Sequence, residues 1–265
     1  MMNIGYLQTH IKLGDKDYNF KHFDEYFSRM SNIDIIVLPE ICNIGYGYEN
    51  RAEIMDLAEE VKNSRTIHFF LERAQKLGTL IVAGFAERQS SNIYNSALAA
   101  FPDGQLKIYR KTHLFDREKE LFEPGDTGFF TFEFQETKIS MIICFDWSFP
   151  ETWRTLAFQG TQIVCMCSNL VLPGKAQKAV PVMCMMNRIF AVCANRIGKE
   201  RDYLFTGRSL IANPAGEILC ESPEDQEEFR WVVIDPAVSL NKWVTPKNHI
   251  FLDRKTEFYA MEKTE

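Results

Sequence analysis

Residues 138–151 read Lys-Ile-Ser-Met-Ile-Ile-Cys-Phe-Asp-Trp-Ser-Phe-Pro-Glu. The nearly continuous apolar run over 138–145 predicts a strand that is buried on both faces. Pro150 suits the first turn of a helix, so a helix is expected over 150–158. Cys144 therefore lies at the carboxyl end of a buried strand and just before a helix. Open α/β sheets place ligands there, and the helix dipole favours a thiolate.

The first part of the chain alternates between strands and helices. Buried strands are expected over 3–8, 34–38 and 80–85, because these runs are apolar and lack helical periodicity. Asp15 and Ser64 are predicted to cap the helices that lie between these strands. The order strand, helix, strand therefore occurs twice.

Closely spaced strands follow, with a hairpin expected over 93–101 and 106–109 around a turn at Pro102-Asp103-Gly104. A helix is expected over 175–188, interrupted by Pro181. Further strands are expected over 162–168, 190–194, 208–212 and 230–234. This pattern predicts one α/β domain over residues 1–265, in which helices cover mixed sheets.

Composition narrows the class of protein. The chain has 265 residues, is 46% hydrophobic, and carries 30 basic against 36 acidic residues for a net charge of −6. It lacks the overall cationic field that attracts nucleic acid or anionic membranes, so a small-molecule partner is expected. The apolar runs are far shorter than the roughly 20 residues of a membrane-spanning helix, and no secretory signal opens the chain. We expect a cytoplasmic protein.

Seven cysteines form an odd set without disulfide or metal-ligand spacing. A free cysteine is most often a small buried hydrophobe, and position alone singles out Cys144 as a candidate nucleophile. Cys42 is less clear, because it follows Glu40 in a loop near the same edge. The remaining cysteines are expected to pack in the core: Cys165, Cys167, Cys184, Cys193 and Cys220.

A thiol with an ordinary pKa near ~8.5 needs a base or a cation beside it at neutral pH. Among the five histidines, only His113 lies in a suggestive segment. Two other side chains also follow predicted strands: Glu40 comes after the strand over 34–38, and Lys111 comes after the hairpin. A Cys144–His113 pair and a Glu40–Lys111–Cys144 cluster are both open on these grounds, and the shared placement at strand ends favours the second.

Three segments resemble the signature blocks of the nitrilase superfamily, the carbon-nitrogen hydrolases. They are Leu38-Pro39-Glu40, the segment 109–115 (Tyr-Arg-Lys-Thr-His-Leu-Phe), and the segment 143–151 (Ile-Cys-Phe-Asp-Trp-Ser-Phe-Pro-Glu). Weaker matches extend the resemblance over almost the whole chain: 45–46, 94–96, 122–125, 195–200, 207–209 and 253–259. The chain departs from many relatives at Met186, where they carry a glutamate.

The resemblance implies a fold and a set of residue roles. The fold is a four-layer αββα sandwich of two mixed sheets, and members form dimers through a shared helix surface. The implied triad is Glu40 as general base, Lys111 and Cys144 as nucleophile, and Glu118 matches the second glutamate of the family. Lys111 and the backbone N–H of Phe145 would stabilise negative charge on the substrate, and a thioester would form on Cys144.

Substrate contacts are expected from Phe145, Tyr46, Trp147 and Asn169, and no metal or cofactor is expected. The sequences of these signature segments are most similar to those of the short branch that holds amidases and small aliphatic nitrilases. We predict hydrolysis of a small amide with release of ammonia. Aliphatic nitrilase or N-carbamoyl amidohydrolase activity is the alternative, and a catalytically silent binding homologue is a third reading.

Overall fold

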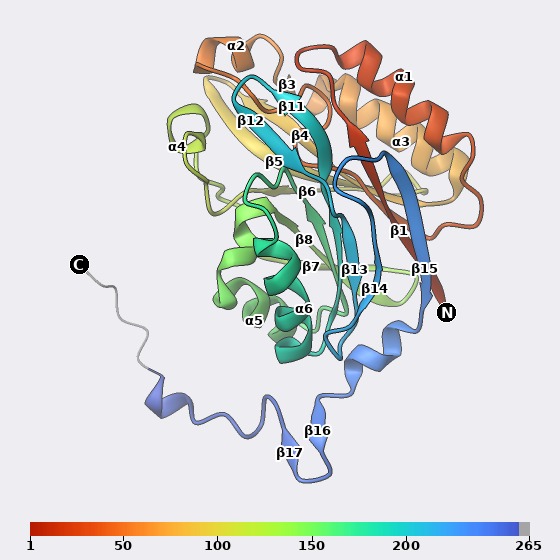
Figure 1. Ribbon diagram of the computed structural model, residues 1–265, viewed down its shortest axis with the longest axis vertical. Helices are drawn as coiled ribbons and strands as arrows, with labels where there is room; N and C mark the ends of the chain where they lie inside the picture. The colour runs from red at the N-terminus through yellow and green to blue at the C-terminus, as the bar shows by residue number, and fades with distance from the viewer. Residues whose placement is uncertain (260–265) are drawn as a thin grey trace.

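The computed structural model describes residues 1–259, and two β-sheets form its centre (Figure 1). The larger sheet has nine strands, in the order β12-β11-β1-β2-β4-β5-β6, with β15 paired to β1 and β3 to β4. These strands are β1 Met2–His10, β2 Ile35–Val37, β3 Glu59–Glu60, β4 Leu80–Gln89, β5 Asn92–Ala100, β6 Leu106–Arg110, β11 Arg196–Glu200, β12 Tyr203–Thr206 and β15 Glu228–Ile234.

The smaller sheet has six strands in the order β14-β13-β10-β9-β8-β7. They are β7 Thr131–Phe134, β8 Thr137–Ile143, β9 Ile163–Cys167, β10 Phe190–Ala194, β13 Leu210–Ala212 and β14 Ile218–Glu221. Strands β8, β9 and β10 run parallel to one another, whereas β7 and β13 join them antiparallel. The larger sheet is also mixed, because β1, β2 and β4 run parallel whereas β5 joins β4 antiparallel.

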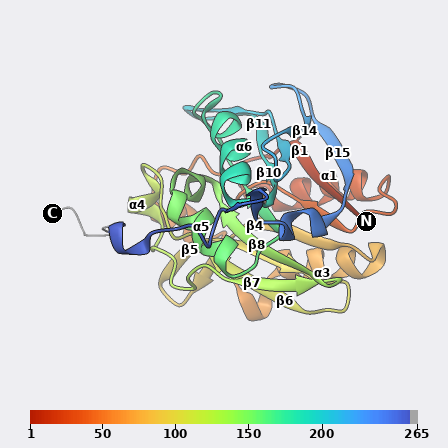
Figure 2. The same cartoon turned by 90° about the horizontal axis from the view of Figure 1, so that it is seen from below.

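The sheets pack face to face, and helices cover their outer faces (Figures 1 and 2). Helices α1 Lys16–Phe27 and α3 Arg65–Leu77 cover the larger sheet, and α5 Pro150–Phe158 and α6 Lys175–Asn187 cover the smaller one. Strand β2 is apolar throughout because both of its faces are buried. Ile35 and Val37 belong to the core shared with the smaller sheet, whereas Ile36 packs with α1 and α3. The predicted αββα sandwich is confirmed.

Two predicted helix starts are confirmed by their capping contacts. The Asp15 side chain accepts the backbone N–H of Tyr18, and Ser64 accepts that of Ile67. The predicted interruption at Pro181 is wrong, because α6 continues through this residue. Val180 and Cys184 on either side of the proline are fully buried against the smaller sheet. This packing outweighs the lost backbone hydrogen bond, whose cost is about 3 kcal/mol.

The remaining elements are short. They are α2 Arg51–Met55, α4 Glu118–Leu121, the 3₁₀ turns η1 Val61–Asn63, η2 Cys144–Ser148, η3 Pro236–Leu240 and η4 Thr256–Phe258, and the hairpin of β16 Trp243–Thr245 with β17 Asn248–His249. After β15 the chain leaves the body of the sandwich and extends past α5 and α6 (Figure 1). Within residues 1–259, we find no helix with the length and apolar character needed to cross a bilayer.

Candidate active site

Glu40 enters the interior because a glycine lies beside it on β4. The backbone N–H of Gly84 donates to Pro39 O at 3.0 Å, which holds the chain against the strand as β2 ends. A Cβ at Gly84 would lie 2.5 Å from Glu40 Cα, so no larger residue fits there. The close approach leaves Glu40 fully buried.

Lys111 follows β6 and is held by its backbone on both sides. Its N–H donates to Asn95 O at 2.8 Å, and its carbonyl accepts the N–H of Gly125 at 2.9 Å. A Cβ at Gly125 would lie 2.1 Å from Arg110 O, so this contact also requires glycine. Only 1% of Lys111 is exposed, and its ammonium points into the interior.

Cys144 lies where β8 ends and η2 begins, with a backbone φ of +40°. Such a φ is strained for a residue with a Cβ, and the surroundings must maintain it. Asp146 supplies that support from a buried position. Its Oδ2 accepts the N–H of Ile143 at 3.0 Å and the hydroxyl of Tyr109 at 2.7 Å. The turn that carries the thiol is thereby tied to the strand that leads into Lys111.

The three predicted triad residues and Glu118 come together around the Lys111 ammonium. Lys111 Nζ lies 2.7 Å from Glu40 Oε1 and 2.7 Å from Glu118 Oε1. The charges of Glu40, Lys111 and Glu118 all act on the pKa of the Cys144 thiol, which is buried beside this cluster. The structure therefore brings together the four side chains that were predicted to be catalytic.

The two carboxylates differ in how their oxygens are bonded. Glu118 accepts three hydrogen bonds, from Lys111 Nζ, from the Tyr46 hydroxyl at 2.7 Å and from the Phe115 N–H at 2.9 Å. Glu40 Oε1 accepts from Lys111 and from Asn95 Nδ2 at 2.6 Å, but its buried Oε2 has no partner among residues 1–259. Both oxygens of Glu118 are thus hydrogen-bonded, whereas Glu40 keeps one oxygen available to accept a proton.

Burial raises the pKa of Glu40 to about 7, although Lys111 opposes this rise and Glu118 adds to it. Burial also raises the pKa of the Cys144 thiol above its usual range, and the charge of Glu40 raises it further. For Lys111, burial alone would lower the pKa, but Glu118 and Glu40 outweigh it and the pKa is raised. At neutral pH the site therefore holds a protonated thiol, a charged lysine and a carboxyl group near its titration point.

Tyr46 is held in place by a buried ion pair. Glu200 Oε2 accepts the backbone N–H of Tyr46 at 2.8 Å and that of Gly47 at 2.9 Å, while Glu200 Oε1 lies 2.7 Å from Arg196 Nη1. The Tyr46 ring also packs edge-on against Tyr203 and Phe205. These contacts aim the Tyr46 hydroxyl at Glu118.

His113 makes its contacts with Asp146. His113 Nδ1 lies 2.8 Å from Asp146 Oδ1, and the imidazole stacks on Phe149 with ring centroids 3.7 Å apart. This geometry favours Glu40 over His113 as the base for Cys144. Cys42 is fully buried and its thiol donates to Gly84 O at 3.3 Å, which is a packing role beside Glu40.

A small cavity opens beside the thiol. It is lined by Phe115, Cys144, Phe145, Trp147, Asn169, Leu170, Val171 and Leu172. Three of the four side chains predicted to contact substrate belong to this lining, namely Phe145, Trp147 and Asn169. Tyr46, the fourth, uses its hydroxyl on Glu118 instead. Asn95 and Gly84 support Glu40 and were not predicted, although Asn95 falls in the matched segment 94–96.

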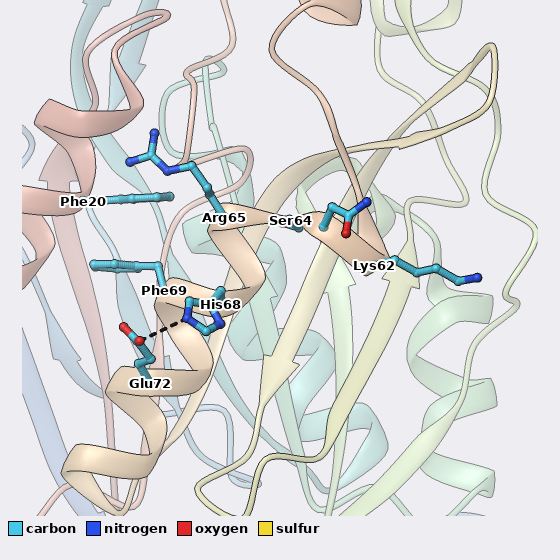
Figure 3. A pocket seen from close by; sticks show the side chains of 8 residues that line it. Phe20, Lys62, Ser64, Arg65, His68, Phe69 and Glu72 are labelled. Atoms are coloured by element: carbon cyan, nitrogen blue, oxygen red, sulfur yellow. Dashed lines mark ion pairs between the residues drawn. The ribbon is translucent and has the colours of Figure 1, made fainter.

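A larger hollow of about 410 Å³ lies at the start of α3 and contains none of these residues (Figure 3). Its lining includes Arg65, His68 and Glu72, and Figure 3 shows the ion pair between the last two. The N–H of Thr66 at this helix start already donates to Glu59 Oε2 at 2.9 Å. Within residues 1–259, no cluster of three or more His, Cys, Asp or Glu side chains is arranged to hold a metal ion.

Comparison with known proteins shows the family of the chain. A family model described as carbon-nitrogen hydrolase matches residues 3–245. The chain belongs to the carbon-nitrogen hydrolase family. The hydrolase is 38% identical to a nitrilase of Pyrococcus abyssi, over 98% of this chain and 99% of that protein. It is 32% identical to an (R)-stereoselective amidase of a Pseudomonas species, over 88% of this chain and 84% of that protein.

The solved structures agree on the fold. An amidase of the nitrilase superfamily from Nesterenkonia AN1 superposes on this hydrolase with a TM-score of 0.83 and 22% identity, over 97% of this chain and 95% of that one. A CN-hydrolase superfamily protein from Xanthomonas campestris superposes with a TM-score of 0.81 and 23% identity, over 90% and 92% of the two chains. These structures show the fold, and the family match together with the nitrilase and amidase relatives shows a hydrolase that acts on carbon-nitrogen bonds.

Proposed function

We propose that this carbon-nitrogen hydrolase is a cysteine amidase that releases ammonia from a small carboxamide through a thioester. The observation that carries the proposal is the unequal bonding of the two carboxylates around Lys111. Glu118 is saturated with donors, whereas Glu40 has one unpaired oxygen and a pKa near 7. A base with these properties can accept and return a proton at neutral pH.

Acylation begins when Glu40 Oε2 takes the proton of the Cys144 thiol. The thiolate then attacks the carbonyl carbon, and the carbonyl π electrons move onto oxygen. Lys111 and the backbone N–H of Phe145 stabilise this oxyanion. When the oxyanion collapses, the carbon-nitrogen bond breaks and the leaving nitrogen takes the proton from Glu40. Ammonia departs, and a thioester remains on Cys144.

Deacylation uses the same base a second time. Glu40, again ionised, removes a proton from water, and the resulting hydroxide adds to the thioester carbon. The second oxyanion collapses, the carbon-sulfur bond breaks and the sulfur recovers its proton from Glu40. Glu118 does not exchange protons in this scheme, because its hydrogen-bonded oxygens serve to orient the Lys111 ammonium.

Nitrile hydrolysis is a second candidate, favoured by the 38% identity to the Pyrococcus abyssi nitrilase. The same thiolate would attack the nitrile carbon, and a thioimidate would precede the thioester. An N-carbamoyl compound would use the same residues. Parallel turnover measurements on an amide and the nitrile of equal carbon skeleton separate these activities.

The proposal is tested by ammonia release from a panel of short amides and nitriles, with intact-protein mass spectrometry after acid quench. An acyl adduct on the Glu40→Gln variant, formed from an activated ester of the best substrate and absent from Cys144→Ala, supports the thioester. If no panel member releases ammonia and no adduct forms, the hydrolase proposal fails and a silent binding homologue remains.

The proposal includes a homodimer that forms through α5 and α6. Phe158, Val182, Met185 and Met186 are each more than 40% exposed on these helices, which is unusual for large apolar side chains gathered on one face. Phe251 of the C-terminal segment packs against Phe158, with ring centroids 4.8 Å apart. Light scattering coupled to size exclusion tests the dimer, and Val182→Arg should shift it towards monomer. Seven free cysteines, six of them buried, support a reducing, cytoplasmic setting.

A further inference from the structure

The cavity beside Cys144 has an apolar character that restricts what can enter it. None of its eight lining side chains belongs to Asp, Glu, Lys or Arg, and Phe115, Phe145 and Leu170 form much of the wall. The cavity is also small, at about 20 Å³. This is close to the space that a single water needs, so only a short acyl group can fit with modest movement of the walls.

Asn169 supplies an exception to this apolar lining. It is 2% exposed, and its Nδ2 donates to the backbone carbonyl of Glu40 at 2.9 Å. A carbonyl oxygen can only accept, so this contact fixes which end of the amide faces Glu40. Asn169 Oδ1 is therefore turned the other way. It is buried and has no hydrogen-bond partner within residues 1–259.

A buried acceptor without a partner is costly, and such a group in a ligand cavity points to a donor on the ligand. Asn169 lines this cavity together with Cys144, and its backbone N–H counteracts the rise in the pKa of the thiol. Its side chain donates to the backbone of the base. Asn169 therefore lies next to both Cys144 and Glu40.

We infer that Asn169 Oδ1 accepts an N–H of the scissile carboxamide, and that the cavity selects carboxamides with a short, uncharged, apolar acyl group. The inference rests on the proposed amidase function and adds its substrate class. A carboxamide offers two N–H donors on the nitrogen that leaves, while its carbonyl oxygen is taken by Lys111 and Phe145. A substrate without an N–H cannot use Asn169 in its ground state, and a charged acyl group would lose its hydration without gaining an ion pair.

The experiment compares propionamide with methyl propionate, which carries the same acyl group without an N–H. Asn169→Leu removes both polar atoms at similar volume. We expect kcat/KM for the amide to fall at least tenfold more than for the ester, mainly through KM. If Asn169 only holds Glu40 in place, kcat/KM should fall equally for the amide and the ester. That result would overturn the inference.

Asn187 provides a matched control, because its Oδ1 is also buried without a partner and its Nδ2 also donates to a backbone carbonyl, that of Met183 at 2.9 Å. It lies on α6, away from the cavity lining. Asn187→Leu should leave the ratio of amide to ester turnover unchanged. An equal change of that ratio in both variants would assign the effect to loss of a buried amide in general and overturn the inference.

Acyl-group selection is tested on the unaltered enzyme with three amides of similar size. Propionamide should be preferred at least tenfold over glycinamide, which is cationic, and over malonamate, which is anionic. Equal or better turnover of either charged amide would overturn the selection. If neither propionamide nor methyl propionate is hydrolysed at all, the proposed function itself has failed, which is a different outcome from an unchanged amide-to-ester ratio.

Discussion

Glu40 and Glu118 bind the same ammonium group, since Lys111 Nζ lies 2.7 Å from one oxygen of each. The two carboxylates share this cation but differ in their other hydrogen bonds. Glu118 is also held by Tyr46 and by the backbone of Phe115, so both of its oxygens accept hydrogen bonds. Glu40 has the raised pKa and the unpaired oxygen, so it is the carboxylate that can accept a proton near neutral pH.

Replacing Lys111 by methionine should abolish most activity and also destabilise the fold. The loss of a charge-stabilising donor in such a site costs about a hundredfold or more in kcat. Two buried carboxylates would then face each other without a cation, at a cost of about 3–5 kcal/mol in the free energy of unfolding. Steady-state kinetics and chemical denaturation measure the two effects. Lys107→Met, an exposed lysine on β6, is the control, and an equal loss in both variants would contradict the assignment.

Amide hydrolysis should increase with pH on the acid side and level off above about pH 7, because only ionised Glu40 accepts the thiol proton. Lys111 lowers the pKa of Glu40, so any residual activity of Lys111→Met should have its acid limb at higher pH. The measurement is kcat/KM across the range. A profile that is flat from about pH 5 to about pH 8 would remove Glu40 as the titrating base.

The same pKa predicts how stability changes with pH. The pKa of Glu40 is raised from 4.5 to about 7, so its contribution favours folding below its ordinary pKa and is lost as pH rises through about 7. Glu40→Gln cannot ionise and escapes this loss. Its free energy of unfolding should therefore increase relative to the unaltered protein between about pH 5 and about pH 8, as measured by urea denaturation. A constant difference across this range would contradict the raised pKa.

His113→Ala should retain measurable turnover, whereas Glu40→Gln should not. The imidazole of His113 is bonded to Asp146, so its removal weakens the support of the Cys144 turn without removing the base. We expect about a tenfold loss of kcat, in line with the loss of one hydrogen bond to a charged group. The reverse order of activities in these two variants would instead support His113 as the base for Cys144.

Gly84→Ala should displace Glu40 and cost about 1–3 kcal/mol of stability through overpacking. The new Cβ would lie 2.4 Å from Ile41 N and 2.5 Å from Glu40 Cα. Gly104→Ala is the control, because no atom lies within 4 Å of a Cβ there although its φ is +88°. The control should lose some stability and keep its kcat. Normal activity of Gly84→Ala would mean that Glu40 does not need this close contact.

Local sequence patterns predicted most of the strands and helices because they report on burial and on backbone termini. The apolar run of β2 and the caps Asp15 and Ser64 are examples, and each depends on neighbours within a few residues. The prediction that Pro181 interrupts its helix is wrong for the same reason. Its local effect is to break a helix, and the packing of α6 on the smaller sheet is a long-range contact that no local pattern reports.

The sequence by itself determined one α/β domain with helices covering mixed sheets, the strand ends that carry Glu40, Lys111 and Cys144, and, through its signature segments, the resemblance that implied the αββα sandwich. Only the tertiary structure decided which carboxylate has an unpaired oxygen, where Tyr46 places its hydroxyl, and which end of Asn169 faces the cavity. Glu40 is 71 positions from Lys111, and Tyr46 is 72 positions from Glu118. Hydrogen bonds across such separations depend on how whole strands and loops pack, and protonation states follow from that packing.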